Sequence, residues 1–272
     1  MFKRKIYDEL LKWKSTSKGK TALLIEGARR IGKSTIVEEF LWALGDTATI
    51  PILKNVFESK KPLGQELNRE LLRKFRLYML VGGMPQAILE YLDSNNLEMV
   101  DQIKRDIINL YEEDFYKIDS SGKISSLYDA IPNELNKHTK GYQVSSVLPS
   151  ERKSTISEEL SELIASKTVL ASYNISDPNV GMSSTYNLDN FRLYSTDVGL
   201  LVTLMFKDSV FTENVVYKKI LGNKLSTNLG IVYENAVAQI LATKGYQLYY
   251  HTYYDEIQKR NYEIDFIIPK GD

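Results

Sequence analysis

The chain has 272 residues, with 35 lysines and arginines against 35 aspartates and glutamates, and this balance creates no overall field that favours nucleic acid or an anionic membrane. With no cysteine and only two histidines, disulfides, cysteine nucleophiles and zinc sites built from these residues are excluded, and a bound metal would be a hard ion such as Mg²⁺ held by oxygens. The longest apolar stretch, residues 198–206, is far shorter than the roughly 20 residues that span a bilayer, and the start of the chain lacks a signal-peptide core, so we expect a cytoplasmic protein with no membrane partner.

The first 45 residues follow the order expected at the start of a nucleotide-binding domain. A helical pattern at 3–14 precedes a short apolar strand at 21–27, and a glycine-rich loop then leads into a helix at 33–44. From Pro51 to Phe115 the pattern is helical almost throughout. Its interruptions are KKPLG (60–64), GGMP (82–85) and DSNN (93–96).

A DSSGK turn at 119–123 begins a section in which three predicted helices precede two predicted strands. This order is typical of a winged helix. The last section contains one predicted helix and two predicted strands. The helices are expected at 124–137, 142–149, 155–166 and 229–245, and the strands at 168–175, 191–196, 246–254 and 262–269.

Residues 27–35, GARRIGKST, fit the phosphate-binding pattern G-x-x-x-x-G-K-[ST]. The glycines let successive backbone N–H groups face the phosphates, and the following helix presents its positive N-terminus. Lys33 is expected to reach the β- and γ-phosphates of ATP, and the Ser34 hydroxyl to bind Mg²⁺. The alternative is a glycine-rich turn with a surface lysine, which the preceding strand and following helix disfavour. The predicted nucleotide contacts are Gly27, Ala28, Arg29, Arg30, Ile31, Gly32, Lys33, Ser34 and Thr35.

The machinery for ATP hydrolysis is missing after this loop. Hydrolysis needs an acidic residue at the end of a second apolar strand and a group that orients water. Between Lys33 and Phe115 no run of four apolar residues ends in two acidic residues, and IINLYEED (107–114) lies in a helical pattern. A single strand at 21–27 also lacks the neighbours that satisfy the backbone groups of a parallel sheet. We therefore expect nucleotide binding without turnover.

The phosphate loop and five later segments of the chain together resemble the AAA-family ATP-binding proteins of bacteria and archaea that carry a C-terminal domain of unknown function. The resemblance covers nearly the whole chain and implies an ATPase with a full sheet after the P-loop helix. Here that helix passes directly into a later family segment near Glu38–Phe40, through an in-frame loss or a gene-assembly artefact. The matching segments are GARRIGKST (27–35), FLWALGD (40–46), RLYMLVGGMPQAI (76–88), 122–206, YENAVAQIL (233–241) and YEIDFII (262–268).

The GGMP segment has two interpretations. In related signalling ATPases, a glycine-proline motif packs its proline near the nucleotide base, and Gly83 and Pro85 match that motif. Alternatively, GGMP is a turn between helices, because glycine permits unusual φ values and proline favours a first helical turn. The two interpretations are compatible.

The predicted winged helix raises the question of DNA binding. Its reading helix, at 154–165, carries Glu158, Glu159 and Glu162 and no basic residue, which suits phosphates poorly. The alternative is a structural or protein-contact module with a solvated acidic face, which we favour. The residues that could form a basic patch just before it are Lys137, His138, Lys140, Arg152 and Lys153.

The C-terminal section resembles restriction-type nucleases. In those enzymes a helix glutamate, a strand aspartate and a Glu-x-Lys on the next strand surround Mg²⁺. Glu234 and Asp265 match the first two positions, whereas the third would follow Asp272. The alternative for Glu234 is a solvent-facing helix residue. Because half of a ligand set does not make a nuclease, we expect no cleavage activity.

The predicted fold is an α/β remnant joined to mostly helical α+β units. The predicted function is ATP binding with Mg²⁺. The alternatives are a non-enzymatic DNA- or protein-binding module and a Mg²⁺-dependent nuclease that lacks its Glu-x-Lys strand. The predicted domains are a truncated P-loop NTPase fragment (1–45), a helical lid-like region (46–118), a winged-helix-like domain (119–206) and a partial restriction-nuclease-like domain (207–272).

Overall fold

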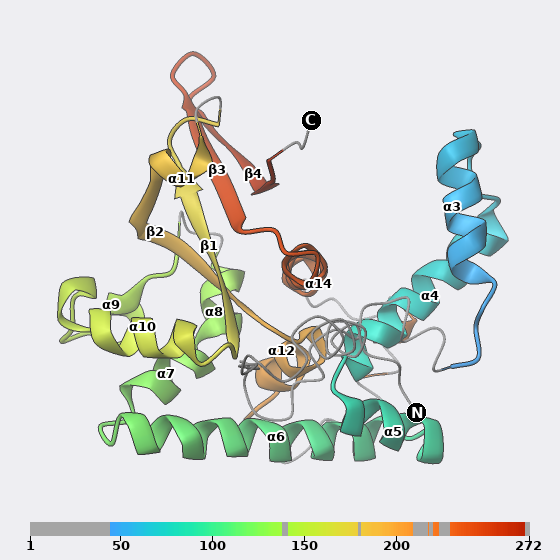
Figure 1. The fold of residues 1–272 in the computed structure, drawn as a ribbon, viewed down its shortest axis with the longest axis horizontal. Helices are drawn as coiled ribbons and strands as arrows, with labels where there is room; N and C mark the ends of the chain where they lie inside the picture. Colours follow the sequence, from blue (N-terminus) through green and yellow to red (C-terminus); the bar gives the residue numbers. More distant parts are fainter. Residues whose placement is uncertain are drawn as a thin grey trace, which may run out of the picture. The chain divides into compact units, whose positions relative to one another are not determined.

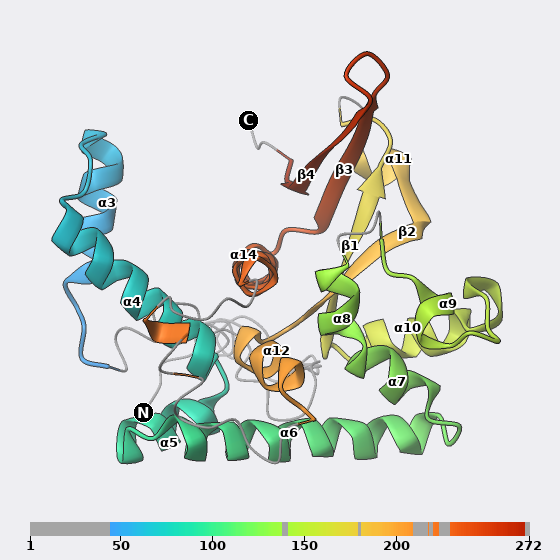
Figure 2. The ribbon, with the colours of Figure 1, turned by 180° about the vertical axis from the view of Figure 1, so that it is seen from behind.

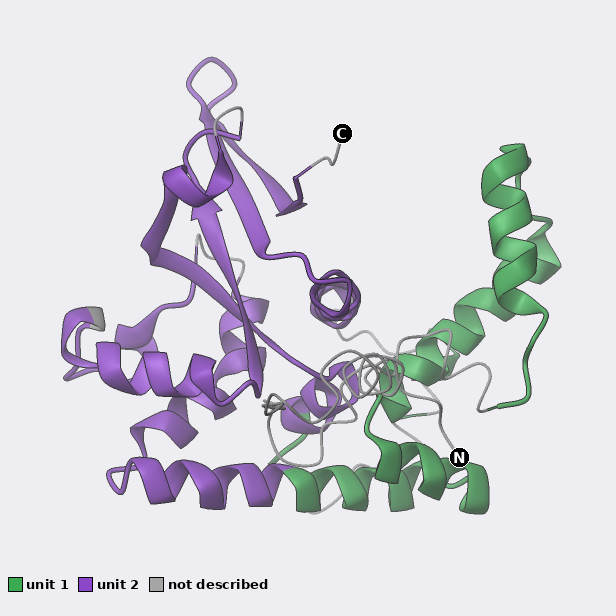
Figure 3. Ribbon diagram, in the orientation of Figure 1, with its two compact units in different colours: residues 1–107, 206–227 green, residues 108–205, 228–272 purple. Residues whose placement is uncertain are grey.

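The structure is a computed structural model that describes residues 44–137, 141–178, 181–208, 217, 220–222 and 229–269. The predicted elements before residue 44, including the phosphate loop, lie outside these residues. The chain divides into two compact units (Figure 3). Unit 1 comprises residues 1–107 and 206–227, and unit 2 comprises residues 108–205 and 228–272. The described part is mostly helical with one small mixed sheet, which confirms the mixed α and β class.

The described helices that begin in unit 1 end where the sequence predicted breaks. Gly82 ends α4 with a φ of 81°, a conformation open to glycine, and its N–H donates to the Tyr78 carbonyl at 2.8 Å. Pro85 begins α5, where its missing N–H removes no helical hydrogen bond. GGMP is therefore a turn between helices, one of its two predicted roles. The helices are α3 (Thr49–Ser59), α4 (Gln65–Val81), α5 (Pro85–Ser94) and α6 (Leu97–Ile118), the last of which continues into unit 2 (Figure 1).

Short helices follow α6 in unit 2. Asp119 accepts hydrogen bonds from the backbone N–H groups of Ser121 and Ile124, which explains why the DSSGK turn begins a new helix. The single helix predicted at 124–137 was wrong in one respect: it is two helices, because Pro132 has no N–H with which to continue the first. The helices are α7 (Lys123–Asp129), α8 (Ile131–Asn136), α9 (Val144–Val147), the 3₁₀ helix η1 (Lys153–Thr155) and α10 (Ser157–Ala165).

Four strands of unit 2 form one mixed sheet in the order β2-β1-β3-β4. The four predicted strands are present and pair as two antiparallel hairpins, β1 with β2 and β3 with β4, the first of which includes the short helix α11. Parallel pairing of β1 with β3 joins the two hairpins. The strands predicted for a winged helix and for a nuclease-like unit thus share one sheet, and the winged helix itself stays a prediction. The bounds are β1 (Val169–Ile175), α11 (Met182–Thr185), β2 (Tyr186–Ser195), β3 (Leu248–Asp255) and β4 (Arg260–Ile267).

Two further helices, α12 (Val198–Met205) and α14 (Gly230–Thr243), complete unit 2. α12 forms most of the apolar stretch noted in the sequence and is buried over nearly its whole length. α14 lies beside the sheet (Figures 1 and 2), where Ala238 packs with Tyr194 and Leu248 in a buried cluster. No helix in the described ranges is long and apolar enough to cross a membrane.

Candidate functional site

Arg192 is a charged side chain in a buried part of β2. The strand is buried from Phe191 to Ser195, and only 8% of Arg192 is exposed. Because successive side chains of a strand face opposite sides, Arg192 and Tyr194 share one face of the sheet. A guanidinium cannot give up its proton in a protein, so a buried arginine needs acidic or aromatic partners.

Three carboxylates are its partners. Glu234 comes from α14, while Glu263 and Asp265 come from β4, where a spacing of two residues places both on one face. Arg192 Nη1 lies 3.3 Å from Oε1 of Glu234 and 3.6 Å from Oδ1 of Asp265. Arg192 Nη2 donates to Oε1 of Glu263. These four residues are named the arginine–carboxylate cluster.

Two tyrosines border the cluster. The Tyr194 hydroxyl donates to Oε1 of Glu234 at 2.5 Å, and the central guanidinium carbon of Arg192 lies 4.6 Å from the centre of the Tyr250 ring. Burial, followed by the charge of Glu234, raises the pKa of Tyr194 well above its usual value, so the hydroxyl keeps the proton that it donates. Burial also raises the pKa of Tyr250, to about 12.

The cluster contains more acidic groups than basic ones. Burial alone would lower the pKa of Arg192, but the negative charges of its neighbours, Glu263 and Glu234 among them, outweigh burial and raise this pKa. Burial raises the pKa of Glu263, and Asp265 raises it further, while the attraction of Arg192 offsets part of the effect. Glu263 therefore holds its proton to a higher pH than a free glutamate does, which relieves part of the negative charge.

The cluster lines an open cavity of about 50 Å³. Glu134 of α8 also lines it, and this carboxylate accepts hydrogen bonds from Lys137 and Ser146 at 2.5 Å and from the Gln143 N–H at 2.8 Å. Gly141 belongs to the same wall and lies so close to β2 that a Cβ there would meet Oδ1 of Asn190 at 2.7 Å. A Cβ there would also meet the Phe191 carbonyl oxygen at 3.0 Å, so a larger residue would require neighbouring atoms to shift.

Two side-chain amides of α14 fix the helix that carries Glu234. The Asn235 amide accepts from the Ser195 N–H at 2.8 Å and donates to the Ser195 carbonyl at 3.0 Å, as a neighbouring strand would. Gln239 accepts from the N–H of Val198 at 3.0 Å. Both amides are buried and satisfied, so they hold α14 against the junction of β2 and α12.

The structure brings the two residues of the predicted nuclease-like half-site, Glu234 and Asp265, to one nitrogen of Arg192. Within the described ranges, no group of three or more histidines, aspartates or glutamates is placed to hold a metal ion. Mg²⁺ needs near-octahedral oxygen ligands at about 2.0–2.1 Å. The guanidinium lies between these carboxylates, so the residues present fit an arginine and do not fit Mg²⁺.

Arg192, Tyr194 and Glu263 were not predicted from the sequence. Two signals could have identified them. One is an arginine inside the apolar and aromatic strand predicted at 191–196, which requires a counter-charge. The other is the spacing of Glu263 and Asp265, which puts two carboxylates on one face of a strand.

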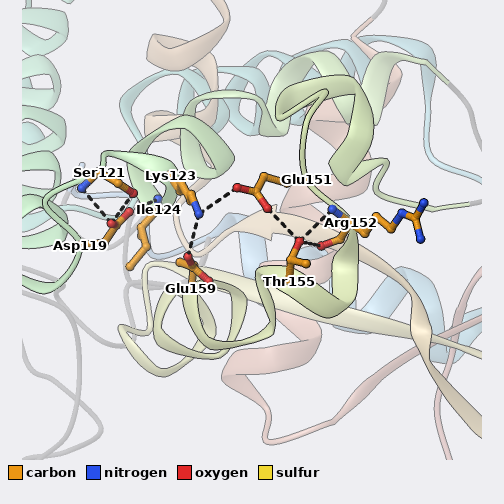
Figure 4. A network of polar contacts seen from close by, with 8 residues as sticks. All are labelled: Asp119, Ser121, Lys123, Ile124, Glu151, Arg152, Thr155 and Glu159. Atoms are coloured by element: carbon orange, nitrogen blue, oxygen red, sulfur yellow. Dashed lines mark hydrogen bonds and ion pairs between the residues drawn. The ribbon is translucent and has the colours of Figure 1, made fainter.

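The region of the predicted DNA-reading helix is acidic and internally paired. Lys123 contacts Glu151 at 3.0 Å and Glu159 of α10 at 3.5 Å, as Figure 4 shows. In the same network Asp119 accepts hydrogen bonds from Ser121 and Ile124. The Thr155 hydroxyl contacts Glu151 and the backbone of Arg152, and the guanidinium of Arg152 points away from the other residues of the network.

In the predicted basic patch, Arg152 is exposed. Lys137 is paired with Glu134 at 2.5 Å. His138 and Lys140 lie outside the described residues. On α10 itself Glu158 and Glu162 are exposed.

The predicted phosphate contacts, Gly27 to Thr35, also lie outside the described residues. Pro85 is described and is partly exposed at the start of α5. Just before the GGMP turn, at the end of α4, the Leu80 carbonyl accepts a hydrogen bond at 2.7 Å from Nζ of Lys104, a fully buried lysine. The structure thus places Pro85 on a fixed turn, and its contact with a nucleotide base stays a prediction.

Fold and site together define a mixed α and β domain in which a buried arginine gathers carboxylates from a helix and an edge strand. Residues 72–210, just over half of the chain, match the model of a family described as Domain of unknown function (DUF8612), and the chain belongs to this family. The matched region contains Arg192 and ends before α14 and β4, which supply the three carboxylates. No curated protein and no solved structure matches the chain.

Proposed function

We propose that the chain binds ATP with Mg²⁺ through residues 27–35 and does not hydrolyse it. The observation that carries this proposal is the spacing of Gly27, Gly32, Lys33 and Ser34, set between a predicted strand and a predicted helix. Backbone N–H groups of the loop would surround the phosphates, Lys33 would neutralise their charge, and the Ser34 hydroxyl would bind the ion.

Two observations support binding without turnover. Every strand within the described ranges belongs to the mixed sheet of unit 2, and none of them follows the phosphate loop as the strand with the Mg²⁺-holding carboxylate would. The sequence between Lys33 and Phe115 also lacks an apolar run that ends in two acidic residues. Pro85, at the start of α5, would lie near the base of the bound nucleotide, as the AAA-family resemblance implies.

Titration of a fluorescent ATP analogue into the full chain tests this proposal. We expect the Lys33→Ala variant to bind at least tenfold more weakly than the wild type, because it loses the cation that faces the phosphates. Lys61→Ala, which removes an exposed lysine elsewhere, should bind like the wild type. Equal affinities for the wild type and Lys33→Ala would overturn nucleotide binding at this loop, and phosphate release by the wild type would overturn the absence of turnover.

A second candidate function is a non-enzymatic protein-binding module in unit 2. The acidic, exposed residues of α10 and the pairing of Lys123 and Lys137 with glutamates favour a protein over DNA as the partner. In a DNA mobility-shift assay at two salt concentrations, we expect no salt-sensitive complex. A complex that weakens steeply with salt, and strengthens in the Glu158→Lys variant, would favour a DNA-binding module instead.

A further inference from the structure

Arg192 connects the two edges of the sheet. In the order β2-β1-β3-β4, Arg192 lies on one edge strand, and Glu263 and Asp265 lie on the other. In a flat sheet these strands would lie about 14 Å apart, three strand spacings, which is farther than one arginine side chain reaches. The ion pairs between them therefore require the sheet to curl, as twisted sheets do.

The guanidinium is held from several directions. Glu234 approaches it from α14, Glu263 and Asp265 approach it from β4, and the ring of Tyr250 on β3 lies against it. A planar group with five N–H donors can satisfy several carboxylates at once, whereas a single metal ion would need their oxygens much closer together. A permanent positive charge at this position also repels any divalent cation.

We infer that Arg192 is the permanent cation of the arginine–carboxylate cluster and takes the position between Glu234 and Asp265 that a divalent ion would need. Its ion pairs also hold edge strand β4 against β2 and α14. The wild-type cluster consequently takes no Mg²⁺ or Mn²⁺. This inference does not depend on nucleotide binding at residues 27–35.

Titration with Mn²⁺ alone, followed by the electron paramagnetic resonance of the free ion, tests the first part in the nucleotide-free full chain. The wild type and Asp265→Asn should bind Mn²⁺ equally. A wild-type Mn²⁺ site that disappears in Asp265→Asn would overturn the inference.

Hydrogen exchange tests the second part, the attachment of β4. Arg192→Lys keeps the charge but loses the fork of donors, so we expect the amides of β4 to exchange at least tenfold faster than in the wild type. Amides of α4, in unit 1, should be unchanged. The matched control is Arg260→Lys, an exposed arginine on β4 that should leave exchange unaltered. Equal exchange of β4 in Arg192→Lys and the wild type would show that Arg192 does not fasten this strand.

Discussion

Among the described residues, each compact unit buries one cation, and the two cations are held in different ways. In unit 1 the Nζ of Lys104 donates to the Leu80 carbonyl and lies 3.3 Å from the hydroxyl of Tyr217, which donates to Asp101 at 2.5 Å. In unit 2 Arg192 faces three carboxylates at the wall of an open cavity. The lysine belongs to a buried chain of hydrogen bonds. The arginine instead lies at the centre of a group of carboxylates that is open to solvent.

The difference shows two uses of a buried positive charge. A lysine that meets a carbonyl and a hydroxyl satisfies groups that would otherwise lose their bonds to water, and so it fixes one turn. An arginine presents a planar fork and can connect several elements at once. Unit 1 uses its cation for the turn before α5, and unit 2 uses its cation to hold a sheet edge against a helix.

The largest expected effect is on Lys104. Lys104→Met leaves the Leu80 carbonyl and the Tyr217 hydroxyl without this donor in a buried site, and we expect a loss of about 3 kcal/mol in the free energy of unfolding of unit 1. Hydrogen exchange of the amides in α4 and α5 measures this loss locally.

Lys117→Met is the matched control, because Lys117 lies on the same helix, α6, with a side chain that is 63% exposed and paired with Asp114. Its effect should stay below about 0.5 kcal/mol. Equal exchange in the two variants would contradict the idea that the buried lysine fixes the turn.

An intermediate effect is expected for the hydroxyl of Tyr194. Tyr194→Phe keeps the ring, which lies 5.7 Å from that of Phe266, and removes only the hydrogen bond to Glu234. Because a hydrogen bond to a charged group contributes about 1.5–3 kcal/mol, unit 2 should lose about 1.5 kcal/mol of stability. Urea unfolding of the variant measures it, with Tyr253→Phe, 56% exposed, as the control that should change nothing. A loss no larger than that of the control would show that Glu234 is positioned by other contacts.

Local patterns predicted the described helices and strands well. The breaks at 60–64, 82–85 and 93–96 were confirmed, because glycine, proline and asparagine determine the backbone locally. The four predicted strands were confirmed for the same reason: alternation and turn residues act over short distances. The parallel pairing of β1 with β3 was not predicted, since it joins segments about 75 residues apart that share no local signal.

The candidate site was predicted only in part. Glu234 and Asp265 were identified through a family resemblance, and the structure brings them together. Their common partner, Arg192, was missed because it reaches β4 only when the sheet curls, a property of the whole sheet. The role of Asn235 was missed similarly, because its amide pairs with the backbone of Ser195 from a distant helix.

The smallest expected effect is the pH dependence that Glu263 gives to β4. Its pKa in the folded chain is raised above the ordinary 4.5, chiefly by burial. A group with a raised pKa stabilises the fold fully below 4.5, and this contribution is lost as the pH rises through the folded pKa. Glu263→Gln cannot ionise but still offers Arg192 an oxygen, so the opening free energy of β4 should change less between pH 4.5 and 8 than in the wild type.

Glu134→Gln provides the control with the opposite sign. Burial opposes the charge of Glu134, but its hydrogen bonds with Lys137, Ser146 and the Gln143 N–H outweigh burial and lower its pKa. Its contribution is therefore present above the ordinary 4.5 and is lost as the pH falls through the folded pKa. Glu134→Gln should lower the free energy of unfolding of unit 2 by about 1.5 kcal/mol at pH 7. At acidic pH the difference in this free energy between the variant and the wild type should become smaller. If Glu263→Gln and Glu134→Gln changed the pH dependence of stability in the same direction, the pKa values of Glu263 and Glu134 would not be shifted in opposite directions. The excess of negative charge assigned to the arginine–carboxylate cluster would then be wrong.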